Sequence, residues 1–201
     1  MSVMTAFITR CLKNVSLLLC LLAGLAMAAQ AETIGSRRAE AEVTTDGQLS
    51  VSTRFQTRLT PSLSDALEQG VVLPFRLEFQ LTKPRLTAYY LNFSEWFDPH
   101  AQLGFKLSYQ SLTNRYRVTI GGLSNYYPTL REALGAVGAI QGWRVLNSGT
   151  LDPRAPGRVA GQVRLLLDIG ELPKPFQLNA LGSADWSLSS DWIKLDVKDG
   201  G

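Results

Sequence analysis

Apolar and polar side chains alternate along much of the chain beyond residue 31, which is the pattern of β-strands that bury one face. The clearest run covers residues 75–82, and its apolar positions are Phe75, Leu77, Phe79 and Leu81. Shorter runs of the same period predict strands over 39–44, 49–56, 103–109, 115–120, 159–169 and 193–197, with others within 86–97 and at 143–146. Turn residues at Asp46-Gly47 and at 111–114 predict two antiparallel hairpins.

Two other segments have helical spacing. Thr60 and Pro61 start a short helix that Gly70 ends. Its predicted buried residues are Leu63, Ala66 and Leu67. Thr129 and Glu132 form a capping box for a second, longer helix. Its apolar residues are Leu130, Leu134, Val137 and, if the helix extends so far, Ile140.

Seven to nine short strands with one or two short packed helices predict a mainly β fold. We expect an antiparallel β-sandwich, immunoglobulin-like or built on a strongly curved sheet. A ligand-holding barrel also fits the length. Beyond residue 31 the chain has 170 of its 201 residues, which is enough to bury a core without disulfides or metal ions. Residues 32–201 are therefore expected to form a single β-rich domain.

Residues 1–31 are predicted to be a signal peptide for the general secretory route. Arg10 and Lys13 precede an apolar run over residues 15–27, which is shorter than the ~20 residues that a spanning helix needs. The small residues around Gln30 place cleavage after Ala31. A periplasmic location follows, with no stable membrane span after cleavage. A retained N-terminal anchor is the alternative.

Composition then excludes several chemistries. Both cysteines, Cys11 and Cys20, lie in the predicted leader, so the mature chain has no disulfide, zinc–cysteine site or thiol nucleophile. The leader also holds two of the 20 basic residues and no acid, which leaves 18 basic against 17 acidic residues. The overall basicity is therefore no argument for a nucleic-acid partner. Glycine loops that bind phosphates or dinucleotides are absent, and we expect no cofactor.

A catalytic site is not predicted either. His100 is the only histidine, and with Glu95 and Asp98 nearby it is interpreted as a surface-loop residue rather than a metal ligand or general base. Without a Gly-x-Ser-x-Gly motif, a serine hydrolase is not expected. Asp185 and Asp191 could act as paired carboxylates of a glycan hydrolase. The preferred interpretation is that both acids cap turns while the adjacent tryptophans fill the edge of the core.

Arginines and aromatic rings give two further hypotheses about binding. Arginines recur on predicted polar strand faces, at positions 54, 76, 115, 117 and 164. They either form a basic face for an anionic partner or pair across strands with Glu40, Glu42, Glu78 or Asp168. The rings expected to be exposed, as on a glycan-binding surface, are Tyr89, Tyr90, Trp96, Tyr126, Tyr127 and Trp186.

Two stretches of the sequence are more specific than the alternation of apolar and polar residues. Residues 107–118 read Leu-Ser-Tyr-Gln-Ser-Leu-Thr-Asn-Arg-Tyr-Arg-Val, and residues 172–181 read Leu-Pro-Lys-Pro-Phe-Gln-Leu-Asn-Ala-Leu. Together with the leader and the 60–70 helix, the chain resembles the exported proteobacterial family catalogued as domain of unknown function 4390. The resemblance implies a periplasmic or envelope-associated protein with no established activity, cofactor or catalytic residues. It also suggests a membrane sensor kinase as a signalling partner.

The second stretch and the residues that follow it are the predicted binding segment. Pro173 and Pro175 predict an extended backbone that excludes a helix, and the segment either wraps the edge of the sandwich, which we prefer, or forms a recognition surface. The candidate binding residues are Lys174, Phe176, Gln177, Asn179, Asp185, Trp186, Asp191 and Trp192. We expect a non-catalytic domain that binds an envelope protein, for example the exported part of a sensor. A glycan-binding module or a carboxylate-dependent glycan hydrolase is the alternative.

Overall fold

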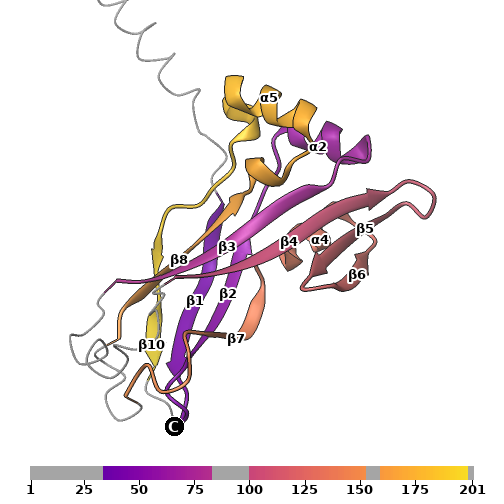
Figure 1. The fold of residues 1–201 in the computed structure, drawn as a ribbon. Coiled ribbons are helices and arrows are strands. Elements are labelled where there is room, and N and C mark those ends of the chain that lie inside the picture. Colours follow the sequence, from indigo (N-terminus) through magenta and orange to yellow (C-terminus); the bar gives the residue numbers. More distant parts are fainter. Residues whose placement is uncertain (1–33, 83–99, 153–158, 199–201) are drawn as a thin grey trace, which may run out of the picture. The chain divides into compact units, whose positions relative to one another are not determined.

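The computed structural model describes residues 34–82, 100–152 and 159–198 (Figure 1). Within these ranges, ten β-strands form two separate sheets, connected by three α-helices and two short 3-10 helices. The predicted mainly β fold is therefore confirmed. The predicted signal peptide and the strand expected within 86–97 lie outside the described residues, as do Tyr89, Tyr90, Glu95, Trp96 and Asp98.

The first sheet has four strands in the order β10-β1-β2-β7. Their bounds are β1 (Gly35–Val43), β2 (Leu49–Gln56), β7 (Ile140–Val145) and β10 (Asp196–Lys198). β1 and β2 form the predicted hairpin, and Gly47 in its turn takes the left-handed backbone (φ +76°) that glycine adopts without strain. β10 pairs with β1 in parallel, while the other pairs of this sheet are antiparallel.

The second sheet has six antiparallel strands in the order β6-β5-β4-β3-β8-β9. Their bounds are β3 (Leu73–Leu81), β4 (His100–Gln110), β5 (Arg115–Ile120), β6 (Leu123–Tyr127), β8 (Gly161–Leu167) and β9 (Ile193–Lys194). His100 is exposed, but it begins β4 opposite Gln80 rather than lying in a loop. The loop assignment was wrong because β3 extends far enough to pair with residues that have no apolar alternation.

The apolar faces of the two sheets meet in one core, as in a β-sandwich. Phe55 of β2, Phe75 and Phe79 of β3 and Phe105 of β4 are each at most 2% exposed. Burying a side chain of this size stabilises the fold by about 2–3 kcal/mol relative to leaving it in water. The alternation read from the sequence is thus the pattern of core contacts.

The last predicted strand divides between the two sheets. Residues Ile193 and Lys194 pair with β8 of the second sheet, and Val197 pairs with Ala41 of the first. Leu195 lies at the crossing and is 8% exposed. The prediction of one strand over 193–197 was therefore wrong, because strand periodicity does not tell which sheet a residue joins.

The two predicted helices form, and one is shorter than expected. α2 (Pro61–Glu68) starts at Thr60, whose hydroxyl accepts the backbone N–H of Leu63 at 3.3 Å. α4 (Leu130–Ala136) starts at Thr129 in the same way. It ends before Gly138, which has a left-handed backbone (φ +75°), so Ile140 belongs to β7 and not to the helix.

A third helix contradicts the extended backbone predicted from Pro173 and Pro175. α5 (Lys174–Gly182) has Pro173 at its N-cap and Pro175 in its first turn. Backbone N–H groups of a first helical turn have no intrahelical acceptor, so proline there removes no hydrogen bond. The 3-10 helices η2 (Ile169–Glu171) and η3 (Ala184–Trp186) flank α5 along the chain.

Candidate functional site

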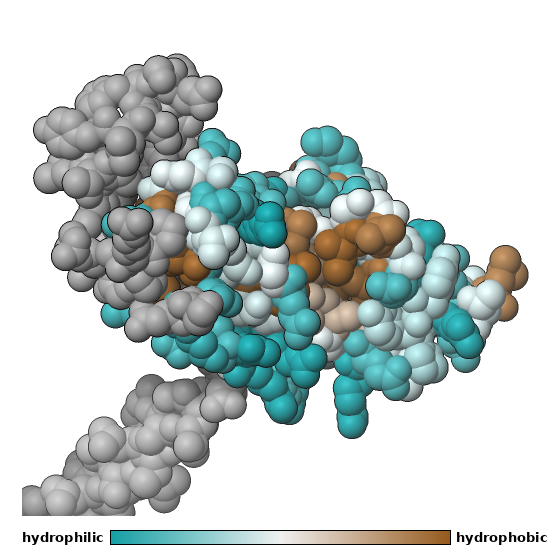
Figure 2. Space-filling model, turned by 90° about the horizontal axis from the view of Figure 1, so that it is seen from below, coloured by the Kyte–Doolittle hydropathy of each residue, from teal (hydrophilic) through white to brown (hydrophobic). Residues whose placement is uncertain are grey.

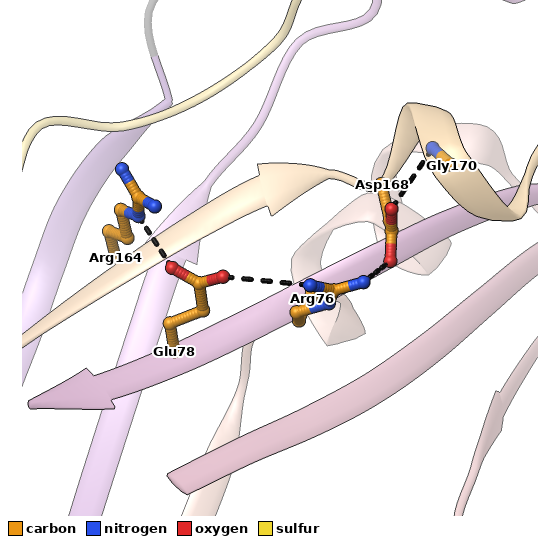
Figure 3. A network of polar contacts seen from close by, with 5 residues as sticks. All are labelled: Arg76, Glu78, Arg164, Asp168 and Gly170. Carbon is orange, nitrogen blue, oxygen red and sulfur yellow. Dashed lines mark hydrogen bonds and ion pairs between the residues drawn. The ribbon is translucent and has the colours of Figure 1, made fainter. Parts of the chain in front are cut away.

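Two of the arginines on predicted polar faces are neutralised by acids on the second sheet (Figure 3). Arg164 Nε lies 2.6 Å from Glu78 Oε2, and Arg76 Nη1 lies 3.8 Å from Glu78 Oε1. Arg76 also pairs with Asp168, which accepts the backbone N–H of Gly170 at 3.1 Å. The cross-strand pairing considered from the sequence is confirmed for Arg76 and Arg164.

The other three arginines of that set do not share one surface. Arg117 Nε donates to Ser108 Oγ at 3.3 Å, and Arg115 is exposed on the same strand, β5. Arg54 lies on β2 of the other sheet. The five side chains therefore do not form a single basic face.

Aromatic members of the predicted binding segment take part in packing. The rings of Phe176 and Trp186 lie 5.6 Å apart between centroids, and Trp186 is only 8% exposed. The expectation that Trp186 is exposed was wrong, because η3 turns its ring into the core. Trp192 is half-buried, and the guanidinium carbon of Arg164 lies 4.5 Å from its ring centroid.

Polar members of the segment hold α5 against η2. Gln177 Nε2 donates to the carbonyl oxygens of Gly170 and Leu172, both at 2.7 Å. Lys174 Nζ donates to Gln177 Oε1 at 3.3 Å, while Asn179 is exposed on the helix. These bonds favour the structural interpretation of the segment over the recognition surface.

The two candidate carboxylates are both exposed, but the adjacent rings do not form a platform beside them. Asp185 follows the η3 N-cap, and its carbonyl oxygen accepts the Thr60 hydroxyl at 2.6 Å. Asp191 follows Ser190, whose hydroxyl accepts the buried N–H of Leu165 at 3.0 Å. With Trp186 packed in the core, the geometry gives no specific support to glycan hydrolysis by this pair.

Exposed apolar residues are dispersed over the described surface. They are Val72, Leu112, Leu123, Tyr126 and Leu178. Figure 2 shows one face with hydrophobic areas separated by hydrophilic side chains, including a hydrophobic tip at the end where the β4–β5 hairpin lies in Figure 1. The expected exposure of Tyr126 is confirmed at 52%, whereas Tyr127 is half-buried against the core.

A further candidate site lies between the end of β2, α4 and the β5–β6 hairpin. It is an open cavity of about 1310 Å³, which we call the arginine groove. Four of its lining residues are Arg37, Arg54, Arg58 and Arg131. Its apolar lining includes Phe55, Leu59, Ile120, Tyr127, Leu130 and Leu134. Such a mixture of apolar surface and a few convergent charged groups is typical of binding sites.

The arginine groove is short of acidic side chains. Glu132 is the one acid among the residues that line it. Arg37 Nε donates to Gln56 Oε1 at 3.0 Å. Arg54, Arg58 and Arg131 are exposed, and within the described part of the chain none of the three is in an ion pair. Unpaired guanidinium groups that share one cavity create a local positive potential.

One residue of the groove lining, Thr57, has an unsatisfied polar group. The residue is only 6% exposed, and its hydroxyl is buried. Among the residues that the structure describes, its Oγ1 is the buried side-chain polar atom without a hydrogen-bond partner. Leaving a buried hydroxyl unpaired costs about 1–3 kcal/mol, so such atoms are rare in folded proteins and call for an explanation.

Comparison with known protein families gives a match. A family model described as Domain of unknown function (DUF4390) matches residues 31–196. This chain belongs to the DUF4390 family. The match confirms the resemblance seen in the sequence and includes the whole of the two described sheets except the end of β10. Comparisons with curated proteins and with solved structures returned no match.

In the described part of this DUF4390 protein, no helix has the length and apolar character needed to cross a membrane. The same residues contain no group of three or more His, Cys, Asp or Glu side chains that could hold a metal ion. The arginine groove is the candidate site that combines several cationic side chains with an apolar lining.

Sequence reasoning found only one of the four groove arginines. Arg54 was selected for its place on a polar strand face, but Arg37, Arg58 and Arg131 were not. Arg37 and Arg58 come from β1 and the segment after β2, at the two ends of one hairpin, whereas Arg131 comes from α4, far along the chain. The short distance in sequence between Arg54 and Arg58 was the available local signal for a cluster of arginines. It does not show that Arg131 lines the same cavity.

Proposed function

We propose that this DUF4390 protein is an exported, non-catalytic binding domain that holds an acidic part of an envelope protein in the arginine groove. The observation that supports this proposal is the charge of the cavity, with four lining arginines against Glu132. The exported part of a membrane sensor is one candidate partner, and the periplasm is the proposed location.

The physical basis is a local excess of positive charge on an almost neutral chain. Beyond residue 31 the basic residues exceed the acidic residues by only one, 18 against 17. A cluster of unpaired arginines in such a chain favours encounter with an anionic surface and discriminates against a basic one. Guanidinium groups bind carboxylates with two parallel hydrogen bonds, which gives geometric selectivity as well as attraction.

The apolar lining supports binding of a peptide rather than of a simple ion. Leu59, Tyr127 and Leu130 line the same cavity as the arginines and are only half-buried. A ligand that carries both carboxylates and apolar groups would remove this surface from water while it pairs with the guanidinium groups. An acidic polypeptide segment has both properties.

The test uses fluorescein-labelled poly-L-glutamate as the probe and protein purified from cells that express the full chain. Anisotropy titrations compare the wild type with Arg54→Glu/Arg131→Glu. The matched control is Lys106→Glu/Arg115→Glu, because these cations are also exposed, change the net charge by the same amount and do not line the groove.

We expect the groove variant to weaken binding by about tenfold or more, equivalent to at least about 1.4 kcal/mol. The control should weaken it by less than about threefold, since isolated surface charges contribute little. Equal losses in the two variants would show a diffuse charge effect and would overturn the proposal. Circular dichroism and urea unfolding establish that both variants are folded.

A further inference from the structure

The end of β2 has a strand neighbour on one side only. β7 pairs with β2 from Leu49 to Thr53, where Thr53 lies opposite Ile140. β1 pairs with β2 as far as Gln56, opposite Gly35. In the described part of the chain, residues 54–56 therefore have a strand on the β1 side and none on the other. Main-chain groups along such an edge form a template for an additional strand.

This free edge lies at the arginine groove. Residues 54–59 all line the cavity, so the end of β2 that lacks a second strand neighbour and the segment after it border open space. The stretch 54–58 is about 17 Å long at the ~3.3 Å rise of an extended residue. The hydroxyl of Thr57 in this stretch is buried, so an added chain would pair with main-chain groups of the edge rather than with this side chain.

The side chains around the edge indicate the composition of such a chain. Successive side chains of a strand point to opposite faces, so one set can meet charged groups while the other meets apolar groups. Arg54 and Arg58 are exposed, and the half-buried Leu59 and Leu130 line the same cavity. Carboxylates directly opposite guanidinium groups stabilise strand pairs, and lysines or arginines there would destabilise them.

From these observations we infer that the partner contributes an acidic, extended segment that pairs, as an added strand, with the end of β2 and the two residues after it, over residues 54–58. The inference rests on the proposed function and specifies the conformation of the bound segment. Its acidic side chains lie among Arg37, Arg54, Arg58 and Arg131, and its alternate apolar side chains lie against the apolar lining. A bound helix would satisfy its own backbone and leave the edge of β2 unpaired, so the free edge favours an extended ligand.

The first test selects a phage-displayed library of random nine-residue peptides on the wild type and, in parallel, on Arg54→Glu/Arg131→Glu. Peptides enriched on the wild type should carry Asp or Glu at alternating positions, with β-branched or aromatic residues between them. The charge-reversed variant should not enrich these peptides. Enrichment without acidic residues, with helical spacing of three and four, or no enrichment at all would overturn the inference.

The second test examines the main-chain pairing directly. The most enriched peptide is synthesised unmodified and with backbone N-methyl groups at alternating residues, which removes the N–H donors and keeps every charge. Hydrogen exchange should slow at amides within residues 54–58 when the unmodified peptide binds, and the N-methylated peptide should bind about tenfold or more weakly. Equal binding of the two peptides, or unchanged exchange at these amides, would refute strand addition.

The outcomes separate the inference from the proposed function. If poly-L-glutamate binding depends on Arg54 and Arg131 but the peptide tests fail, the groove binds anions without strand pairing, and only the inference falls. If poly-L-glutamate binding is also insensitive to the groove variant, both fall. Lys106→Glu/Arg115→Glu serves as the control in both tests, and it should retain the selected peptides.

Discussion

Replacement of Gly138 by alanine gives a quantitative test of how the helix-to-strand connection packs on the core. Gly138 follows α4 and has a left-handed backbone, with φ +75°. A Cβ added there would lie 2.7 Å from Leu165 Cδ2 and 2.9 Å from Phe55 Cδ2. Leu165 is fully buried and Phe55 is 2% exposed, so neither side chain can move into solvent.

The expected cost has two destabilising contributions and one compensation. An alanine in the left-handed region costs about 1–2 kcal/mol. Forcing a methyl group into a closely packed core costs about 1–3 kcal/mol more. Alanine also lowers the entropy of the unfolded chain, which returns about 0.4–1 kcal/mol. We therefore expect Gly138→Ala to lower the free energy of unfolding by about 2–4 kcal/mol.

The control is Gly149→Ala, which isolates the backbone contribution. Gly149 has nearly the same φ, +78°, but nothing lies within 4 Å of its added Cβ. Urea unfolding followed by tryptophan fluorescence should give a loss of about 1 kcal/mol for Gly149→Ala. With a denaturant slope of about 2 kcal/mol/M, the midpoint for Gly138→Ala should fall by about 1–2 M. Equal shifts for the two variants would refute the proposed close contact with Phe55 and Leu165.

Three further predictions concern other parts of the described fold. Phe176→Ala should lower the free energy of unfolding by about 1–3 kcal/mol, because its half-buried ring packs on a buried tryptophan. The control Leu178→Ala, at a site 73% exposed, should change this free energy by less than about 0.5 kcal/mol. Similar urea midpoints for the two variants would contradict the packing of α5. Asp168→Asn should lower the free energy of unfolding by about 1–3 kcal/mol in the same assay, because it removes the charge that pairs with an arginine on β3. An unchanged free energy would mean that this pair does not stabilise the fold. The side-chain hydrogen bond from Arg38 holds the pKa of Glu40 below its ordinary value of 4.5. The stabilisation from Glu40 is thus present above pH 4.5 and is lost as the pH falls through the lower pKa that Glu40 has in the folded protein. Glu40→Gln should therefore flatten the acidic side of a curve of unfolding free energy against pH. An unaltered curve would exclude this contribution.

Local patterns in the sequence determined most of the secondary structure. Period-two alternation located the strands of the core, because a half-buried strand must place apolar residues on one face. Thr60 and Thr129 located the two helix starts, since the capping hydroxyl accepts an N–H only three residues away. These interactions join neighbours in the chain, which is why the sequence alone revealed them. The same local reasoning misassigned α5, where Pro173 and Pro175 fit a helix start as well as an extended segment.

Tertiary structure decided how these elements combine and where a binding site exists. The alternating residues around Leu195 divide between two sheets because β1 and β8 each offer a free edge there. The arginine groove joins Arg37 and Arg54 of the β1–β2 hairpin to Arg131 of α4, which is far from them in the chain. Whether an arginine is paired or left facing a cavity depends on which acids the fold brings within reach. A sequence orders residues along one dimension, whereas the potential of a cavity depends on distances in three.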